Sequence, residues 1–209
     1  MSALPVIALF LPAGARADAW VSAWLATAEA ARTLVLAHGD VYAQPAHPLY
    51  AQVLEAPAAS RASLRPVCVC CVPQRGLVRT LDESSWRFAR GGRRAYERVL
   101  LLSNAAEPTA VLRTLLDDAR IAAKYALARC LVALREGPPG AAVEDGLLRR
   151  LELADALLVD ADARPAWQAW LAQAGVPPPV CSELASALAL PVPAPAALHA
   201  LRERAHPGF

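Results

Sequence analysis

Apolar runs of strand length alternate along the chain with segments in which apolar residues recur at helical spacing. The expected strands are residues 5–11, 33–37, 98–103, 128–134 and 156–160, with a short last one near residue 180. The expected helices are residues 18–32, 108–122, 143–153 and 164–174, together with one within residues 72–81. Strands that alternate with helices in this way predict a mostly parallel sheet with helices on both faces, a three-layer α/β fold.

The pattern predicts a single domain over residues 1–209, interrupted by two segments rich in proline and alanine. Residues 44–65 are expected to be an irregular loop region with one short helix, and residues 188–209 a tail with a short helix at 195–204. No apolar run reaches the length of about 18 residues that suggests a membrane span. No basic segment precedes the short apolar run at 4–11, so a secretory signal is not indicated. We therefore expect a cytoplasmic protein without a membrane partner.

Composition and charge give no reason to expect a nucleic-acid partner. Hydrophobic residues make up 56% of the chain and charged residues 19%, and the net charge is +2. A charge of this size, spread over the whole chain, is too small a field to attract a polyanion. Only residues 87–94 are locally cationic, with Gly91 and Gly92 between arginines, and a solvated loop is the expected structure there.

Three cysteines, Cys68, Cys70 and Cys71, fall within four residues. Clustered thiols in a reducing compartment more often form a metal site than a disulfide framework, and thiolates select zinc, copper(I) or an iron–sulfur centre. Zinc completes a tetrahedron, so a fourth ligand is expected, and a position filled by water, substrate or a partner would suit a transfer site. The side chains that could supply it are His38, Asp40, His47 and Glu107, among which spacing does not choose.

The same cysteines also have a purely structural interpretation. Free cysteine is among the most buried residue types, so all three could be small core residues on or near a strand. A disulfide between Cys70 and Cys71 would be strained, and Cys130 and Cys181 are expected to be structural. A nucleophilic cysteine paired with a histidine that is distant in sequence stays open.

The segment around the cysteines, residues 64–81, resembles the C-x-C-C motif and following helix of the CobW-type (CobW, HypB and UreG-like) metallochaperone GTPases. The resemblance extends over nearly the whole chain. Phe10 to Ala17 take the place of the family's P-loop, residues 101–108 take the place of E-T-S-G-L-A-D-P, and residues 154–163 take the place of A-D-x-x-x-x-N-K-x-D. It implies a P-loop NTPase-like fold, GTP binding and metal handling. The chain ends soon after the last expected helix, so we expect the family's C-terminal domain to be lacking.

The nucleotide motifs of the family are degenerate in this chain. A working P-loop needs glycines for close backbone approach, a lysine for the phosphate charge and a hydroxyl for magnesium. Pro12 removes a backbone N–H, Ala15 replaces the lysine, and Arg16 with Ala17 replaces the two threonines. The degenerate nucleotide-binding positions are Pro12, Ala13, Gly14, Ala15 and Arg16.

No other position in the sequence supplies the missing lysine of the P-loop. Lys124 is the only lysine, far from any glycine-rich turn, and Arg16 places its charge one position late. In the guanine-reading motif the asparagine and lysine are missing, and Asp162 matches the base-reading aspartate only if the register slips by one.

We therefore expect a CobW-like pseudo-GTPase without catalytic residues, which binds zinc or another soft metal through Cys68, Cys70 and Cys71 and does not use GTP with magnesium. The expected partners are the metal ion and a client metalloprotein or a full-length CobW-like protein. Two alternatives stay open: an active GTPase metallochaperone with a divergent P-loop, and a structural or interaction protein with buried cysteines.

Overall fold

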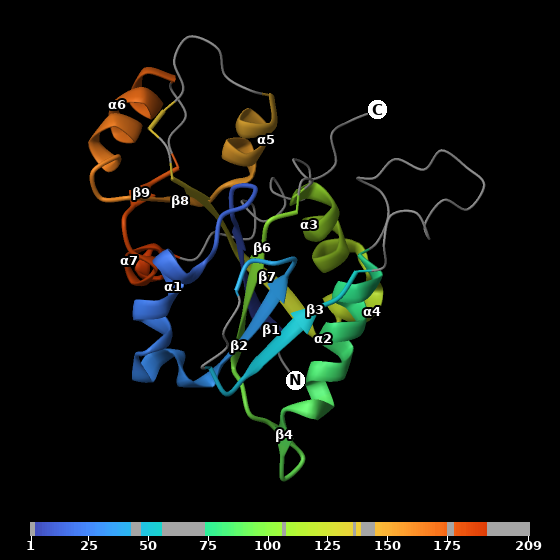
Figure 1. The fold of residues 1–209 in the computed structure, drawn as a ribbon. Helices are drawn as coiled ribbons and strands as arrows, with labels where there is room; N and C mark the ends of the chain where they lie inside the picture. Colours follow the sequence, from blue (N-terminus) through green and yellow to red (C-terminus); the bar gives the residue numbers. More distant parts are fainter. Residues whose placement is uncertain are drawn as a thin grey trace, which may run out of the picture.

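The strands of the main sheet run parallel to one another in the order β3-β2-β6-β1-β7-β8-β9 (Figure 1). The computed structural model describes residues 3–42, 47–55, 74–105, 108–135, 137–138, 145–174 and 178–191. The strands are β1 Leu4–Phe10, β2 Thr33–His38, β3 Tyr50–Val53, β6 Arg98–Ser103, β7 Tyr125–Leu134, β8 Ala156–Val159 and β9 Val180–Cys181. The three-layer α/β fold predicted from the sequence is confirmed.

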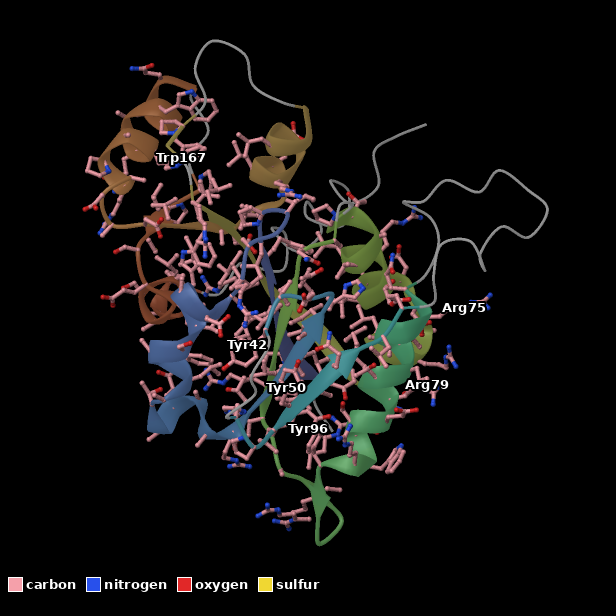
Figure 2. All side chains as sticks on the ribbon, in the orientation of Figure 1. Tyr42, Tyr50, Arg75, Arg79, Tyr96 and Trp167 are labelled. Carbon is pink, nitrogen blue, oxygen red and sulfur yellow. The ribbon has the colours of Figure 1, made fainter. Side chains whose placement is uncertain are left out.

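Helices cover both faces of this sheet (Figure 1). One face carries α2 Arg75–Arg87, α3 Pro108–Asp117, α4 Ala119–Ala122, α5 Asp145–Leu153 and α6 Arg164–Ala174. The other carries α1 Asp18–Leu25, the 3₁₀ helix η1 Ala28–Arg32 and α7 Leu184–Ala189. Figure 2 shows Trp167 of α6 among the side chains that fill the space between helices and sheet.

Strand β6 illustrates why the strands read as continuous apolar runs. Val99 and Leu101 pack in the core beneath α2 and α3, whereas Leu100 and Leu102 pack in the core beneath α1 and α7. Because successive side chains of a strand point to opposite faces, a strand covered on both sides needs apolar residues at every position. The same alternation holds in β1, its neighbour in the sheet.

Two predicted helices are each broken into two shorter ones. The expected helix at 18–32 ends at Leu25, and η1 begins after Thr27, whose backbone is extended and whose hydroxyl donates to the Trp24 carbonyl at 2.6 Å. The expected helix at 108–122 is interrupted at Asp118, whose side chain accepts hydrogen bonds from the backbone N–H groups that open α4. In both places a short polar side chain that bonds to nearby backbone competes with the continuing helix.

The structure also contains elements that the sequence pattern does not predict. Strand β3 lies inside the region 44–65 that was expected to be irregular, and α7 reaches two residues into the expected tail. The cationic segment 87–94 was predicted as a solvated loop, and that part of the prediction is wrong because it contains the antiparallel hairpin of β4 Ala89–Arg90 and β5 Arg93–Arg94. Gly91 and Gly92, with φ of 57° and 75°, form its turn, since consecutive positive φ values define the type I′ turn of two-residue hairpins.

Within the described part of the chain, no helix has both the length and the apolar character that crossing a membrane requires.

Truncation of a leucine in the centre of the sheet is expected to destabilise the fold strongly. Leu101→Ala removes a fully buried side chain of β6 and should lower the free energy of unfolding by about 2–5 kcal/mol. Leu54→Ala makes the same chemical change at a side chain that is 77% exposed, so its effect should stay within about 0.5 kcal/mol. Urea unfolding of both variants measures the difference, and similar losses would contradict this assignment of the core.

Candidate functional site

The carboxyl edge of the sheet brings polar residues from separate strands into one row. The central residues of β2 and β6, 34–37 and 99–102, are apolar. The strands end at the polar residues His38 and Ser103, which are paired in the sheet register. The row continues to Val53 of β3 on one side and to Phe10 of β1 on the other. Ligands of open parallel sheets bind outside the carboxyl ends of the strands, so this row is the first place to look for a site.

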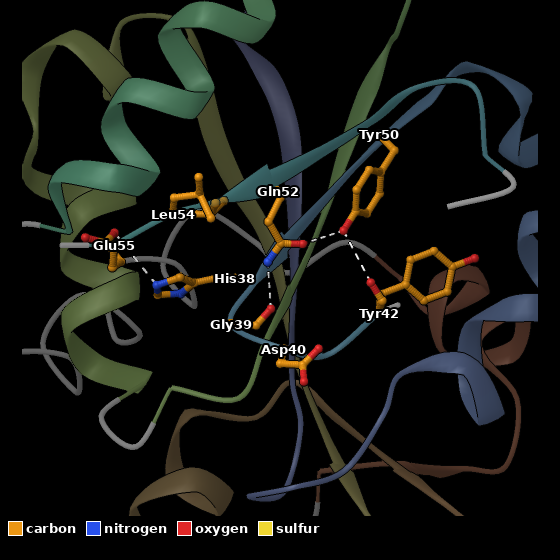
Figure 3. A pocket seen from close by; sticks show the side chains of 9 residues that line it. His38, Gly39, Asp40, Tyr42, Tyr50, Gln52, Leu54 and Glu55 are labelled. Carbon is orange, nitrogen blue, oxygen red and sulfur yellow. Dashed lines mark hydrogen bonds and ion pairs between the residues drawn. The ribbon is translucent and has the colours of Figure 1, made fainter. Parts of the chain in front are cut away.

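His38 is held between a hydroxyl and a carboxylate. Its Nε2 lies 3.7 Å from Glu55 Oε1 (Figure 3). Its Nδ1 lies 3.1 Å from Ser103 Oγ. Ser103 Oγ also accepts a hydrogen bond from the Ala105 N–H at 3.2 Å. Ser103 thereby fixes the plane of the imidazole, and Nε2 faces the acidic side of the site.

Glu55 acts as the N-terminal cap of α2. The Gln74 side chain makes no capping bond, and the Glu55 carboxylate instead accepts hydrogen bonds from the N–H groups of Gly76 at 3.1 Å and Leu77 at 3.0 Å. These helix-terminal N–H groups have no partner within the helix, and the helix dipole favours a negative charge there. Glu55 therefore joins β3, α2 and the imidazole of His38.

A glycine permits this close approach of α2 to the end of β3. A Cβ placed on Gly76 would lie 2.2 Å from the Leu54 carbonyl oxygen and 2.9 Å from the Glu55 carboxylate carbon. Only a residue without a side chain leaves room for the backbone of β3 at this point. The geometry of the Glu55 cap therefore depends on Gly76.

The loop between β1 and α1 holds the positions of the predicted degenerate P-loop. The Ala15 N–H closes a turn by donating to the Pro12 carbonyl at 3.1 Å, and Gly14 has a φ of 69°. The Ala17 N–H donates to the Val41 carbonyl at 2.8 Å. A P-loop holds phosphates with its backbone N–H groups. Two of those groups are used within the protein here, and Pro12 has none.

The charge of this loop is also balanced internally. Arg16 and the neighbouring Ala13 are exposed, and Arg16 Nε lies 3.1 Å from the carboxylate of Asp18 in the first turn of α1. Asp18 places a negative charge where a nucleotide phosphate would approach a helix N-terminus. Lys124 lies directly before β7, at the amino ends of the strands. Its Nζ lies 2.7 Å from Asp82 Oδ1.

The histidines and aspartates named as metal or base ligands lie in different places. His47 lies before β3 at the opposite edge, where Nε2 bonds to the Ala30 carbonyl at 3.1 Å and Nδ1 to the backbone of Leu49. Both ring nitrogens are thus used, and the prediction that His47 is a metal-ligand candidate is not supported. Asp162 is exposed in the turn after β8.

The predicted metal ligands Cys68, Cys70 and Cys71, and the candidate Glu107, lie outside the described residues. Across the described ranges, no group of three or more His, Cys, Asp or Glu side chains is placed to hold a metal ion. Cys130 and Cys181 are buried and form no disulfide, as predicted for structural cysteines. Burial raises the pKa of the Cys181 thiol, and the nearby arginines Arg164 and Arg129 lower it.

The sequence analysis missed several side chains around His38 and Asp40. Tyr42, Tyr50 and Gln52 line a pocket of about 700 Å³ beside these two residues (Figure 3). Tyr50 and Gln52 belong to β3, which is only four residues long and follows a proline-rich stretch, so its period-2 pattern is too short to stand out. Ser103 could have been recognised from the sequence, because it is the polar residue directly after an apolar run, as His38 is.

Comparison with known proteins leaves the family open, since no family model matches the chain and no significant match was found among curated proteins or solved structures.

Addition of one methyl group at Gly76 tests the contact between β3 and α2. Gly76→Ala should lower the free energy of unfolding by about 1–3 kcal/mol, because the new Cβ forces the backbone of α2 away from Leu54 and Glu55. Gly137→Ala is the matched control, because a Cβ there meets nothing within 4 Å, and its effect should stay within about 0.5 kcal/mol. Urea unfolding compares the two variants. Equal stabilities would mean that α2 does not approach β3 as described.

Proposed function

We propose that the chain is a CobW-like pseudo-GTPase of P-loop NTPase-like fold that handles a soft metal ion, with zinc as the first choice, through Cys68, Cys70 and Cys71. The metal is cargo or a regulatory signal, delivered to or received from a client metalloprotein or a full-length CobW-like protein. The observation that carries this proposal is the position of Glu55 and Gln74, the two described residues that flank the cysteine segment.

Glu55 lies beside His38 at the carboxyl edge of the sheet, and Gln74 directly precedes α2, the helix that Glu55 caps. Glu55 faces His38 Nε2 and caps α2, and the Gln74 N–H donates to Thr114 Oγ1 of α3 at 3.0 Å. Gln74 follows Cys71 by three positions, and a separation of three positions spans at most about 11 Å between Cα atoms. This reach is compatible with the proposal that Cys71 binds a metal near the edge at which sheets of this kind bind their ligands.

His38 is the best supported of the non-cysteine ligands. A histidine that binds zinc through one ring nitrogen usually donates the N–H of the other to an oxygen acceptor, such as a carboxylate, a carbonyl group or water, which fixes its orientation. The contact between Nδ1 and Ser103 Oγ supplies that support, and Nε2 is the nitrogen assigned to the metal. His47 does not fit, because both of its nitrogens bond to backbone groups.

The β1–α1 loop supports the absence of nucleotide hydrolysis. Its N–H groups at Ala15 and Ala17 are used by the protein, and Arg16 is paired with Asp18. Phosphate binding would have to break these contacts without a lysine or a magnesium-binding hydroxyl to compensate for them. The fold is therefore proposed to serve as a scaffold for the cysteine segment.

Under reducing conditions, the purified untagged protein is expected to bind about one zinc ion per chain, and cobalt in its place should give sulfur-to-metal charge-transfer bands. Affinity should fall as the pH is lowered, because protons compete with the metal for the thiolates. The double change Cys70→Ser with Cys71→Ser should abolish binding and leave the circular dichroism intact. His38→Gln should weaken binding and keep the charge-transfer bands.

Cys181→Ala is the matched control, because it removes a thiol that lies in β9 and should leave zinc binding unchanged. The metal proposal fails if the reduced protein takes up neither zinc nor copper(I). If the double serine variant also unfolds, the cysteines are core residues, as in the structural alternative.

Nucleotide assays are expected to show no magnesium-dependent GTP hydrolysis and no thermal shift with GTP at submillimolar concentration. Each missing charge-assisted phosphate contact is worth about 1.5–3 kcal/mol, and every 1.4 kcal/mol is about tenfold in affinity. A micromolar site would therefore weaken toward millimolar affinity. Turnover that disappears in Arg16→Ala and persists in Arg32→Ala, another exposed arginine in an ion pair, would instead indicate an active GTPase with a divergent loop.

A further inference from the structure

The pocket beside His38 is bounded by the ends of β2 and β3. Its volume is about 700 Å³, within the range of small-molecule sites. Its lining includes the turn residues Gly39 and Asp40, the rings of Tyr42 and Tyr50, and the amide of Gln52 (Figure 3). The pocket thus combines acidic, aromatic and amide groups at the ligand-binding edge of the sheet.

The described lining carries negative charge and contains no lysine or arginine. Its two carboxylates are Asp40 and Glu55. Glu55 is used by the α2 N–H groups and faces His38, whereas the Asp40 side chain is exposed and makes no hydrogen bond or ion pair with any described residue. Asp40 is therefore the lining carboxylate most open to a ligand.

The pKa values of the two tyrosines are raised, which agrees with a negatively charged environment. Burial raises the pKa of the Tyr50 hydroxyl, and the charges of Tyr42 and Asp40 raise it further. Burial also raises the pKa of Tyr42, with Asp18 as the second cause. Additional negative charge, such as a phosphate, would be repelled here, whereas a cation would be attracted.

The polar side chains of β3 in the lining already bond to each other and to nearby backbone. Gln52 Nε2 donates to the Gly39 carbonyl at 2.8 Å, and Gln52 Oε1 lies 2.5 Å from the Tyr50 hydroxyl. The Tyr50 hydroxyl also approaches the Tyr42 carbonyl at 3.3 Å. The hydroxyl proton of Tyr50 is thus used within the protein, and what this residue offers a ligand is chiefly its ring surface.

The two rings form a tilted pair, with centroids 6.0 Å apart and an angle of 46° between the planes. Aromatic faces attract cations through the negative charge of their π systems, and alkylammonium and guanidinium groups are common ligands of such surfaces. A metal ion fits less well, because no group of three metal-binding side chains is found across the described ranges.

We propose that this pocket binds a small organic cation, an alkylammonium or guanidinium compound, with its charged group beside Asp40 and against the rings of Tyr42 and Tyr50. This site adjoins the metal site proposed above at His38, which lines the pocket, but it does not depend on the cysteines. It gives the domain a small-molecule ligand at the end of β2, whereas the degenerate loop at the end of β1 has no predicted use.

The test is a titration with choline and with its uncharged isostere 3,3-dimethylbutan-1-ol, at constant ionic strength and with a chelator present. Calorimetry and ligand-observed NMR on the full chain should give a dissociation constant for choline of about 1 mM or lower. The isostere should bind at least about fivefold more weakly, because it lacks the charge. n-Butylguanidinium should compete with choline, and inorganic phosphate should not.

Variants assign the binding to the pocket. Asp40→Asn should weaken choline binding by about five- to tenfold, and Tyr50→Leu by a similar factor. Tyr50→Phe, which keeps the ring, should stay within about twofold of the parent protein. Glu97→Gln is the matched control, since it removes a carboxylate that pairs with Arg32 in an exposed ion pair and should leave binding unchanged.

Three outcomes would overturn the proposal: no choline binding, equal binding of choline and the alcohol, or full binding by Asp40→Asn. Retention of choline binding by the Cys70→Ser, Cys71→Ser protein is expected, and its loss would place the ligand on the cysteines instead of in this pocket. Because Asp40 is exposed, its asparagine variant should fold, so that the result can be interpreted even if Tyr50→Leu is unstable.

Discussion

Coverage of both faces of the parallel sheet is the constraint on which the rest of the structure depends. Inside such a sheet a polar side chain has no water to bond with, so polar residues are placed where strands end. Arg129 of β7 is buried, and it satisfies its charge by donating to the carbonyls of Leu190 at 2.6 Å and Pro191 at 3.2 Å, beyond α7. His38 and Ser103 follow the general rule, and the parallel register places them in contact.

At the carboxyl edge of the sheet, the loop after β1 differs chemically from the neighbouring ends of β2 and β3. At the end of β1, the loop bonds to itself and to Val41, and its one cation is paired with Asp18. At the ends of β2 and β3, a histidine, two carboxylates and two tyrosines lie around a pocket. The polar and titratable side chains at this edge are therefore gathered at the ends of β2 and β3 and not at the end of β1.

Much of this architecture could be predicted because the signals are local. Strand β6 and helix α6 have the predicted bounds, since a continuous apolar run and a clear helical periodicity each identify their element without reference to the rest of the chain. The breaks at Thr27 and Asp118 each depend on the hydrogen bonds of one side chain to nearby backbone, which compete closely with helix continuation.

The candidate site was less predictable because its parts are joined only by the fold. His38 could be named as a candidate from its residue type, but its contacts with Ser103 and Glu55 depend on the register of β2 with β6 and on the path of β3. Gly76 shows the same limit. A side chain is excluded at this position by the carbonyl group of Leu54, which lies 22 residues earlier in the chain. Neither periodicity nor composition carries that information.

The two outermost strands of the sheet are short. Strand β3 has four residues and β9 has two, whereas β7, in the interior, has ten. The unpaired backbone groups of an edge strand can template pairing with another molecule, and short edges limit this. A strand of another molecule could form only a few hydrogen bonds with β3 or β9, because both strands are so short. The sheet should therefore resist edge-to-edge association and the growth of intermolecular β structure.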